Sequence, residues 1–140
     1  MRNAIAGSRR RLAVLVLIAV IAVAALVSVA GAAQSGSYRG QSESNRPVVF
    51  NLRDGKVRNF NGGITLYCVF SGMFRFDAAI PPRAMAVNGG RFNYKGKDRT
   101  GQNRIEIHGR FVSRRKAKGT IEMSAPPDCA AKVSFFATHR

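Results

Sequence analysis

Hydrophobic and polar residues alternate with a period of two in a series of short segments after residue 38. Alternation of this kind predicts β-strands that turn one face to a core and the other to solvent. No segment in this part of the chain has the periodicity of a helix. The pattern predicts an all-β fold, an antiparallel β-sandwich or a small barrel of about seven to nine short strands. The clearest apolar rows lie in segments 48–52, 64–70, 105–111, 117–123 and 129–137.

Turn-forming residues separate these segments. Asp54-Gly55 favours a tight hairpin, because this pair readily adopts positive φ. Asn61-Gly62-Gly63 and Asn88-Gly89-Gly90 predict two further turns. The apolar residues of segment 74–80 are expected to continue an inward row, and the polar segment 95–103 predicts an exposed loop.

The N-terminal segment indicates export. Residues 12–33 carry no charge, and three arginines precede them at positions 9–11. A basic flank stays in the cytoplasm, so the chain that follows should lie outside. The run is long enough for a membrane-spanning hydrophobic helix, and it also ends in small residues suited to cleavage after Ala32 or Ala33. We therefore expect residues 1–33 to be a signal peptide or an N-terminal membrane anchor, 34–37 a flexible joint and 38–140 an exported β domain.

The exported part is strongly basic. It contains 19 of the 23 Lys and Arg residues and all 7 Asp and Glu residues, which gives a net charge of +12. A field of this sign attracts anionic partners, among them nucleic acid, wall polymers and membrane head groups. The same charge keeps a small exported domain soluble, and the sequence leaves both interpretations open.

Two cysteines, Cys68 and Cys129, lie in phase with the apolar rows of their strands. An even number of cysteines in an exported domain predicts a disulfide, and the phase predicts that the bond is buried. It would close a loop of about sixty residues and stabilise the fold by about 4 kcal/mol. His108 and His139 could add ligands for a metal, but the spacings are wide and no C-x-x-C occurs, so we expect no metal.

Catalytic patterns are weak in this chain. His108 lies on the polar phase of its strand, and no G-x-S-x-G motif occurs. Glu106 and Glu122 lie on the polar phases of neighbouring strands, as a pair of catalytic carboxylates would. Each is flanked by basic residues, so cross-strand ion pairs are the preferred interpretation. We expect a non-enzymatic domain without a cofactor.

The remaining candidate for a site is a basic segment with six cations between residues 104 and 118, of which Arg110, Arg114, Arg115, Lys116 and Lys118 belong to a predicted hairpin. Such a patch suits phosphate groups. It also suits a solvated hairpin that blunts the edge of a sheet. Specific nucleic-acid binding is not expected, because single strands also need exposed aromatic rings for stacking, for which the candidates are Tyr67 and Tyr94.

Short strand-and-turn motifs cover nearly the whole exported domain. They are Tyr38-Arg39-Gly40, Pro47-Val48-Val49-Phe50, Gly55-Lys56-Val57-Arg58-Asn59-Phe60, Cys68, Asn88-Gly89-Gly90-Arg91-Phe92, Gly109-Arg110-Phe111, Ala117-Lys118-Gly119-Thr120 and Cys129. Together they resemble a group of small exported actinobacterial proteins of unknown function. The resemblance implies an all-β domain with one disulfide, and it implies no catalytic or binding residue.

These observations predict an exported, non-enzymatic β module of the cell envelope or the extracellular space. One alternative is a binding domain for anionic envelope polymers that uses the basic hairpin. Another is a small carrier of apolar ligands, if the strands enclose a cavity. The inward glycines and alanines fit either close packing or such a cavity; they are Gly109, Ala117, Gly119, Ala131 and Ala137.

Overall fold

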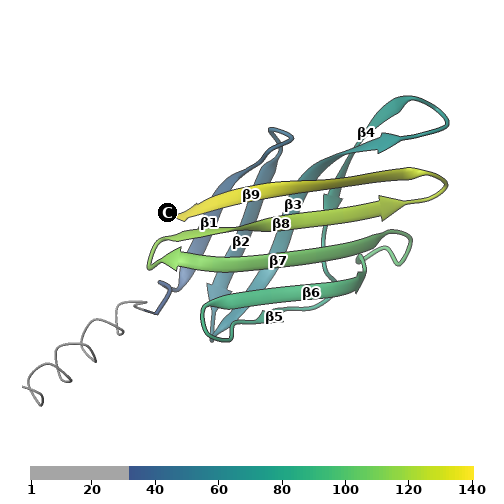
Figure 1. The fold of residues 1–140 in the computed structure, drawn as a ribbon. Helices are drawn as coiled ribbons and strands as arrows, with labels where there is room; N and C mark the ends of the chain where they lie inside the picture. The colour runs from purple at the N-terminus through teal and green to yellow at the C-terminus, as the bar shows by residue number, and fades with distance from the viewer. Residues whose placement is uncertain (1–31) are drawn as a thin grey trace, which may run out of the picture. The chain divides into compact units, whose positions relative to one another are not determined.

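Nine β-strands make up residues 32–140, the part of the chain that the computed structural model describes (Figure 1). The predicted all-β fold is confirmed. Within residues 32–140, no helix has the length and apolar character needed to cross a membrane. The predicted hydrophobic helix of segment 1–33 lies outside the described residues, apart from its last two positions. The strands are β1 (Gly36–Ser42), β2 (Pro47–Arg53), β3 (Lys56–Cys68), β4 (Met73–Ala79), β5 (Met85–Ala86), β6 (Arg91–Lys97), β7 (Arg104–Ser113), β8 (Lys116–Ala125) and β9 (Cys129–His139).

The strands form two layers that are joined along one side. Hydrogen-bonded neighbours follow the order β4-β3-β2-β1-β9-β8-β7-β6, and every pairing between them is antiparallel. β3 also pairs with β9, so β1, β2, β3 and β9 close a small four-stranded barrel. β4 extends one side of this barrel, and β8, β7 and β6 extend the other. In Figure 1 the β6–β9 layer crosses in front of β1–β3.

The core lies between the two layers and is rich in aromatic rings. Phe50 occupies a central position, with its ring centroid 5.0 Å from that of Tyr38, 5.8 Å from Phe60 and 5.6 Å from Phe92. All four side chains are buried. Aromatic pairs of this kind contribute about 0.5–1.5 kcal/mol each beyond the area they bury. Residues from both layers thus share one core, which holds the sheets together.

The predicted turn at Asn61-Gly62-Gly63 is wrong, because β3 runs without interruption from Lys56 to Cys68. The two glycines serve close packing instead. A Cβ atom at Gly62 would lie 2.4 Å from Ile121 Cδ1, and one at Gly63 would lie 2.7 Å from Arg46 Cβ. A substitution at either position would force these neighbours apart. Glycine inside a strand marks a close approach as often as it marks a turn.

A bulge in β3 explains why its apolar residues do not follow a single alternation. Asn59 has a φ of 52°, and the register with β2 shifts between Val49 and Asn51. The extra residue changes the phase of the strand, so that Val57 and Phe60 both point into the core.

The end of the β3–β4 hairpin is also unlike its prediction. Phe70, Phe74 and Phe76 were expected to face inward, but they are 93%, 68% and 64% exposed. The hairpin projects away from the rest of the domain (Figure 1), so neither face of its outer part is covered by the opposite layer. The predicted phase of β4 is also wrong: Phe74 and Phe76 lie opposite Tyr67 and Thr65 on the outer face, and the buried position is Ala79, one residue out of phase with them.

The N-terminal edge of the domain is ordered by hydrogen bonds. β1 starts at Gly36, so the last two residues of the predicted flexible joint belong to a strand. The Gln34 amide donates to the Arg114 carbonyl at 2.8 Å. The hydroxyl of Tyr38 lies 2.8 Å from the Gln34 carbonyl oxygen, and burial raises the pKa of this hydroxyl. The domain therefore begins at or before Gln34.

The segment predicted as an exposed loop, 95–103, contains two buried polar residues. β6 continues to Lys97, and Asp98 and Asn103 then lie inside the loop, 5% and 4% exposed. The Asp98 carboxylate accepts hydrogen bonds from Thr100 Oγ1 at 2.7 Å and from Asn103 Nδ2 at 2.8 Å. Burial alone would raise the pKa of Asp98, but these bonds and those from backbone amides outweigh it and hold the pKa below its ordinary value.

Candidate functional site

Three basic residues lie side by side on the outer face of the β6–β9 layer. Arg91 of β6 is directly opposite Arg110 of β7, and Arg110 is directly opposite Lys118 of β8. All three are exposed. We call Arg91, Arg110 and Lys118 the cationic row. On β9 the next position in the same row is Phe136, which is 59% exposed.

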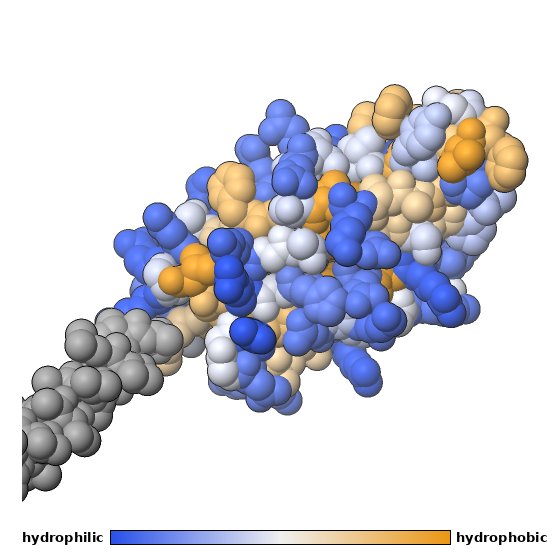
Figure 2. Space-filling model, in the orientation of Figure 1, coloured by the Kyte–Doolittle hydropathy of each residue, from blue (hydrophilic) through white to orange (hydrophobic). Residues whose placement is uncertain are grey.

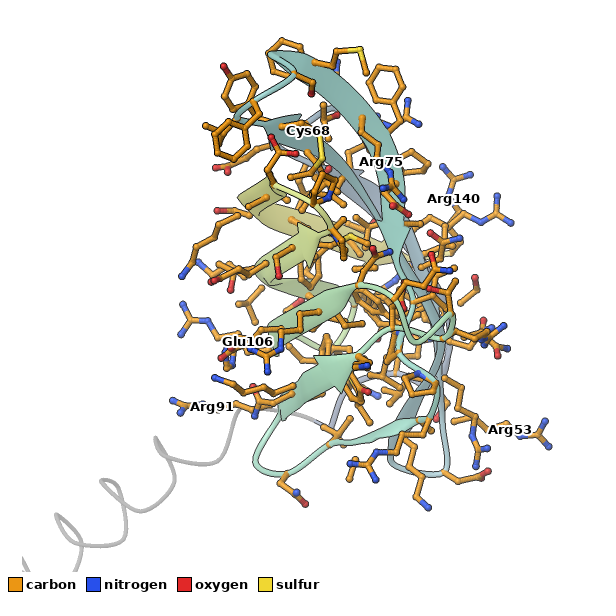
Figure 3. The ribbon with its side chains drawn as sticks, turned by 90° about the vertical axis from the view of Figure 1, so that its right-hand side faces the viewer. Arg53, Cys68, Arg75, Arg91, Glu106 and Arg140 are labelled. Atoms are coloured by element: carbon orange, nitrogen blue, oxygen red, sulfur yellow. A yellow bond between two sulfur atoms is a disulfide. The ribbon has the colours of Figure 1, made fainter. Side chains whose placement is uncertain are left out.

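A second row of charged residues on the same face is balanced. It consists of Lys95, Glu106, Glu122 and Lys132, one from each strand. Lys95 Nζ lies 2.9 Å from Glu106 Oε2, and Lys132 Nζ lies 3.2 Å from Glu122 Oε2. The predicted cross-strand ion pairs of the two glutamates are thus confirmed. Figure 3 shows Glu106 and Arg91 pointing outward on the same side of the layer, with Arg53 on the opposite side of the domain.

Hydrogen bonds fix the charges of this ion-pair row. The Lys95 ammonium, followed by His108, holds the pKa of Glu106 below its ordinary value. In return the Glu106 carboxylate raises the pKa of Lys95. Both groups are therefore charged at neutral pH and neutralise each other. The cationic row contains no acid that could neutralise its three positive charges in the same way.

His108 does not have the contacts of a general base. Its Nε2 atom lies 2.7 Å from Glu106 Oε1, and its Nδ1 atom lies 3.0 Å from Asn93 Oδ1. Both ring nitrogens thus contact oxygen atoms of neighbouring outward side chains, and neither contact is with a hydroxyl or thiol nucleophile. His108 is exposed on the outer face, as its phase predicts. His139, the other histidine named as a possible metal ligand, contacts the Ser35 carbonyl oxygen through Nε2 at 3.0 Å.

A groove of about 580 Å³ lies between the cationic row and its neighbouring row of polar residues. The backbones of Gly109 and Gly119, which lie opposite each other, contribute to its lining. The remaining lining residues are Arg91, Asn93, His108, Arg110, Lys118, Thr120, Ser134 and Phe135. The groove thus offers cations along one side and hydroxyl, amide and imidazole groups along the other, a combination that suits an oxygen-rich anion.

The inward sides of these two glycines are covered by aromatic rings. A Cβ atom at Gly109 would lie 2.1 Å from the Phe92 ring, and one at Gly119 would lie 2.7 Å from the Phe135 ring. The small residues here allow β6, β7, β8 and β9 to pack closely on the core. This arrangement favours close packing over a ligand cavity as the reason for the inward glycines.

The predicted basic hairpin is formed, and the structure divides its residues between two places. Arg110 and Lys118 lie in the cationic row, whereas Arg114 and Arg115 form the turn and Lys116 begins β8. The Arg115 guanidinium lies 3.5 Å from the His139 carbonyl oxygen.

Sequence reasoning missed Arg91. Its outward phase follows from the buried Phe92 beside it, but its position opposite Arg110 depends on strand register, which the alternation does not give.

β7 and β8 are interior strands of their layer. β6 is the edge strand, and β9 lies beyond β8. Blunting of a sheet edge therefore does not explain Arg110 or Lys118, although it does apply to the basic residues of β6.

The predicted disulfide is confirmed. Cys68 at the end of β3 is bonded to Cys129 at the start of β9, and both are buried. Asp128 lies beside the bond, but the two sulfurs are used by the disulfide and are not thiolate ligands for a metal. The bond points to an oxidising location outside the cytoplasm.

Comparisons of the chain with protein-family models, with curated proteins and with solved structures find no match. The resemblance to small exported actinobacterial proteins therefore stays a prediction.

Proposed function

We propose that residues 34–140 form an extracytoplasmic binding module for anionic polymers, which contact the cationic row and the groove beside it. The module carries out no reaction in this proposal. It is either secreted after cleavage at Ala32 or Ala33 or held at the membrane by the N-terminal segment.

The observation that carries the proposal is an unbalanced row of cations on interior strands. Like charges directly opposite each other in a sheet are destabilising. The ion-pair row, four residues away on the same strands, balances each glutamate with a lysine. Arg91, Arg110 and Lys118 have no acid between them, so an anion from outside would relieve their repulsion. This is the electrostatic arrangement expected of a binding surface rather than of a structural one.

The spacing of the row suits a polymer with repeated negative charges. Neighbouring strands lie about 4.8 Å apart, so the three cations extend over about 10 Å across the sheet. Contact with several phosphates would release counterions, which makes the affinity depend steeply on salt. Phe136 adds an exposed apolar surface beside Lys118, which suits the uncharged part of a repeating unit. The proposed partner class is therefore a phosphate-bearing envelope polymer.

Long-chain polyphosphate is a suitable probe for this proposal. The variant R91S/R110S/K118S removes three charges from the cationic row. The matched control, R39S/R53S/R58S, removes three exposed charges from β1, β2 and β3 in the other layer. Binding is measured at several salt concentrations for both variants and for the unchanged domain.

We expect the row variant to lose most of its affinity and to flatten the salt slope by about 2 to 3, because each lost contact contributes about 0.7 to 0.9. The control should bind nearly as the unchanged domain does. Equal losses in the two variants would show that net charge alone attracts the polymer, and the proposed surface would then be wrong.

A further inference from the structure

Six large apolar side chains are exposed together at the end of the β3–β4 hairpin. We call this group the apolar tip. Figure 2 shows apolar residues gathered at the end of the molecule where this hairpin projects. A single exposed apolar residue needs no explanation, but a contiguous group of this size marks a contact surface. Its members are Tyr67, Val69, Phe70, Met73, Phe74 and Phe76.

The tip is apolar on both faces and at its apex. On one face Tyr67 lies opposite Phe74, with ring centroids 5.5 Å apart. On the other face Met73 lies opposite Cys68, and Phe70 occupies the turn, 93% exposed. A flat protein surface, or a strand added to the β4 edge, would cover only part of this group. An apolar medium that surrounds the tip would cover all six of its exposed side chains.

Three backbone amides in the turn of the tip already have partners inside the protein. The Val69 amide donates to the Asp128 carbonyl at 3.3 Å, the Phe70 amide donates to the Asp128 carboxylate, and the Gly72 amide donates to the Cys68 carbonyl at 2.9 Å. An amide that enters an apolar medium without a partner costs several kcal/mol. These donors already have partners inside the protein, so insertion would not expose them.

Covalent and polar contacts at the base of the tip hold it in place. The disulfide joins Cys68, the last residue before the turn, to Cys129, which follows Asp128. The tip is thus fixed to the start of β9 before it meets any partner. Preorganisation of this kind lowers the entropy lost on binding.

The charged groups at the tip are Arg75 and Arg46, with two acids, Asp77 and Asp128, beside them. Segment 67–76 contains no acid, and its one charged residue is Arg75. Arg75 Nη2 lies 2.9 Å from Asp77 Oδ2, and the guanidinium carbon of Arg46 lies 4.5 Å from the Phe76 ring centroid. Aromatic rings next to long cationic side chains are typical of residues at the membrane interface, where the cations reach the head groups.

We propose that the apolar tip inserts into the interface of a bilayer that contains anionic phospholipids. The tip shares no residue with the cationic row or its groove, so its insertion does not depend on the proposed function. β8 runs from Lys118 beside the groove to Ala125 beside the disulfide, a distance of about 23 Å at 3.3 Å per residue. This exceeds the Debye length of about 8 Å at physiological salt, so the cationic row does not drive insertion of the tip.

The chain contains no Trp, so a single introduced Trp reports on one position. The variant F70W places the probe in the tip, and F136W, the matched control, places it on the outer face of β9. Residues 32–140 form a compact unit that holds all the described strands and the buried core, so this domain is tested without the N-terminal segment. It is mixed with vesicles of phosphatidylglycerol and phosphatidylcholine whose acyl chains carry bromine.

We expect the fluorescence of F70W to shift to the blue and to be quenched by the brominated chains, and that of F136W to stay unchanged. Quenching of F136W alone would place the membrane against the cationic row and would overturn the proposal. A blue shift of F70W that needs no lipid and grows with protein concentration would identify a second copy of the chain as the partner. Absence of vesicle binding would also overturn it.

Serine substitutions give a second measurement. F70S/F74S should weaken vesicle binding by about a hundredfold or more, because burial of each of the two rings contributes at least about tenfold. Both side chains are exposed, so the fold should be unaffected. The control V112S removes an exposed apolar side chain outside both surfaces and should bind vesicles as the unchanged domain does. Equal loss in the two variants would contradict insertion of the tip.

Discussion

The two ends of strands β8 and β9 carry opposite chemistry. At one end the β7–β8 turn presents Arg114, Arg115 and Lys116. At the other end the disulfide between Cys68 and Cys129 fixes the apolar tip. Both ends are hairpins with exposed side chains, so neither composition is required by the core. Where the core does not require a residue type, the exposed side chains indicate the kind of partner. Cations attract polyanions, and a group of aromatic rings favours a surrounding apolar medium.

The two ends also differ in how firmly they are held. The apolar end has a disulfide and, in the loop 98–103, a buried carboxylate with several hydrogen bonds. The basic end is held chiefly by backbone hydrogen bonds, such as that from the His139 amide to the Arg115 carbonyl at 2.8 Å. Loss of the disulfide or of the buried carboxylate should therefore cost stability, whereas substitution of exposed side chains at either end should alter binding alone.

The largest expected effect is loss of the disulfide. The variant C68S/C129S should lower the free energy of unfolding by about 4 kcal/mol, since the bond closes a loop of 61 residues in the unfolded chain. Denaturant unfolding measures this change, and limited proteolysis should show new cleavage near residues 69–72. An unchanged unfolding midpoint would mean that the apolar tip is held by other contacts.

The next effect concerns Asp98. Replacement by alanine leaves the buried amide of Asn103 without its partner and should cost about 2 kcal/mol. T100A, which removes only one donor to the carboxylate, is the control and should cost less. Denaturant unfolding at neutral pH compares the two variants.

Asp98 also makes stability depend on pH. Its pKa is lower in the folded than in the unfolded state, so its contribution is complete above the ordinary pKa of aspartate and is lost as the pH falls through the lowered folded value. The unchanged domain should therefore lose stability in acid more steeply than D98A. Parallel acid profiles for the two proteins would contradict this role.

The smallest effect on stability is expected at the basic turn. The variant R114S/R115S/K116S should change the free energy of unfolding by no more than about 0.5 kcal/mol, because the side chains are exposed. Binding to polyphosphate should weaken, with a salt slope lower by up to about 3. A slope equal to that of the unchanged domain would restrict the binding surface to Arg91, Arg110 and Lys118.

Local patterns predicted those parts of the fold in which one face of a strand is buried. Alternation identified the inward rows of β2, β7, β8 and β9, and phase alone placed Cys68 and Cys129 in the core. It failed at Gly62 and Gly63, where glycine permits close packing rather than a turn. Burial of a strand depends on the layer opposite it, which local sequence does not encode.

The same limit explains what was missed at the two candidate surfaces. Phe70 and Phe74 have the spacing of core residues, but Phe70 lies in the turn and the register sets Phe74 opposite Tyr67 on the outer face of the β3–β4 pair. The cationic row needs the register that sets Arg91 beside Arg110, and register follows from the pairing of whole strands. The basic segment itself was visible in the sequence because charge, unlike register, is a local property.

The central claim is that two separate surfaces serve two kinds of partner. One crossed measurement tests it directly: binding of R91S/R110S/K118S and of F70S/F74S to polyphosphate and to vesicles of phosphatidylglycerol and phosphatidylcholine. We predict that the first variant loses polyphosphate binding and keeps vesicle binding, and that the second does the reverse. If either variant lost both binding activities while its unfolding midpoint stayed unchanged, the two surfaces would act as one site. The claim of two separate surfaces would then be wrong.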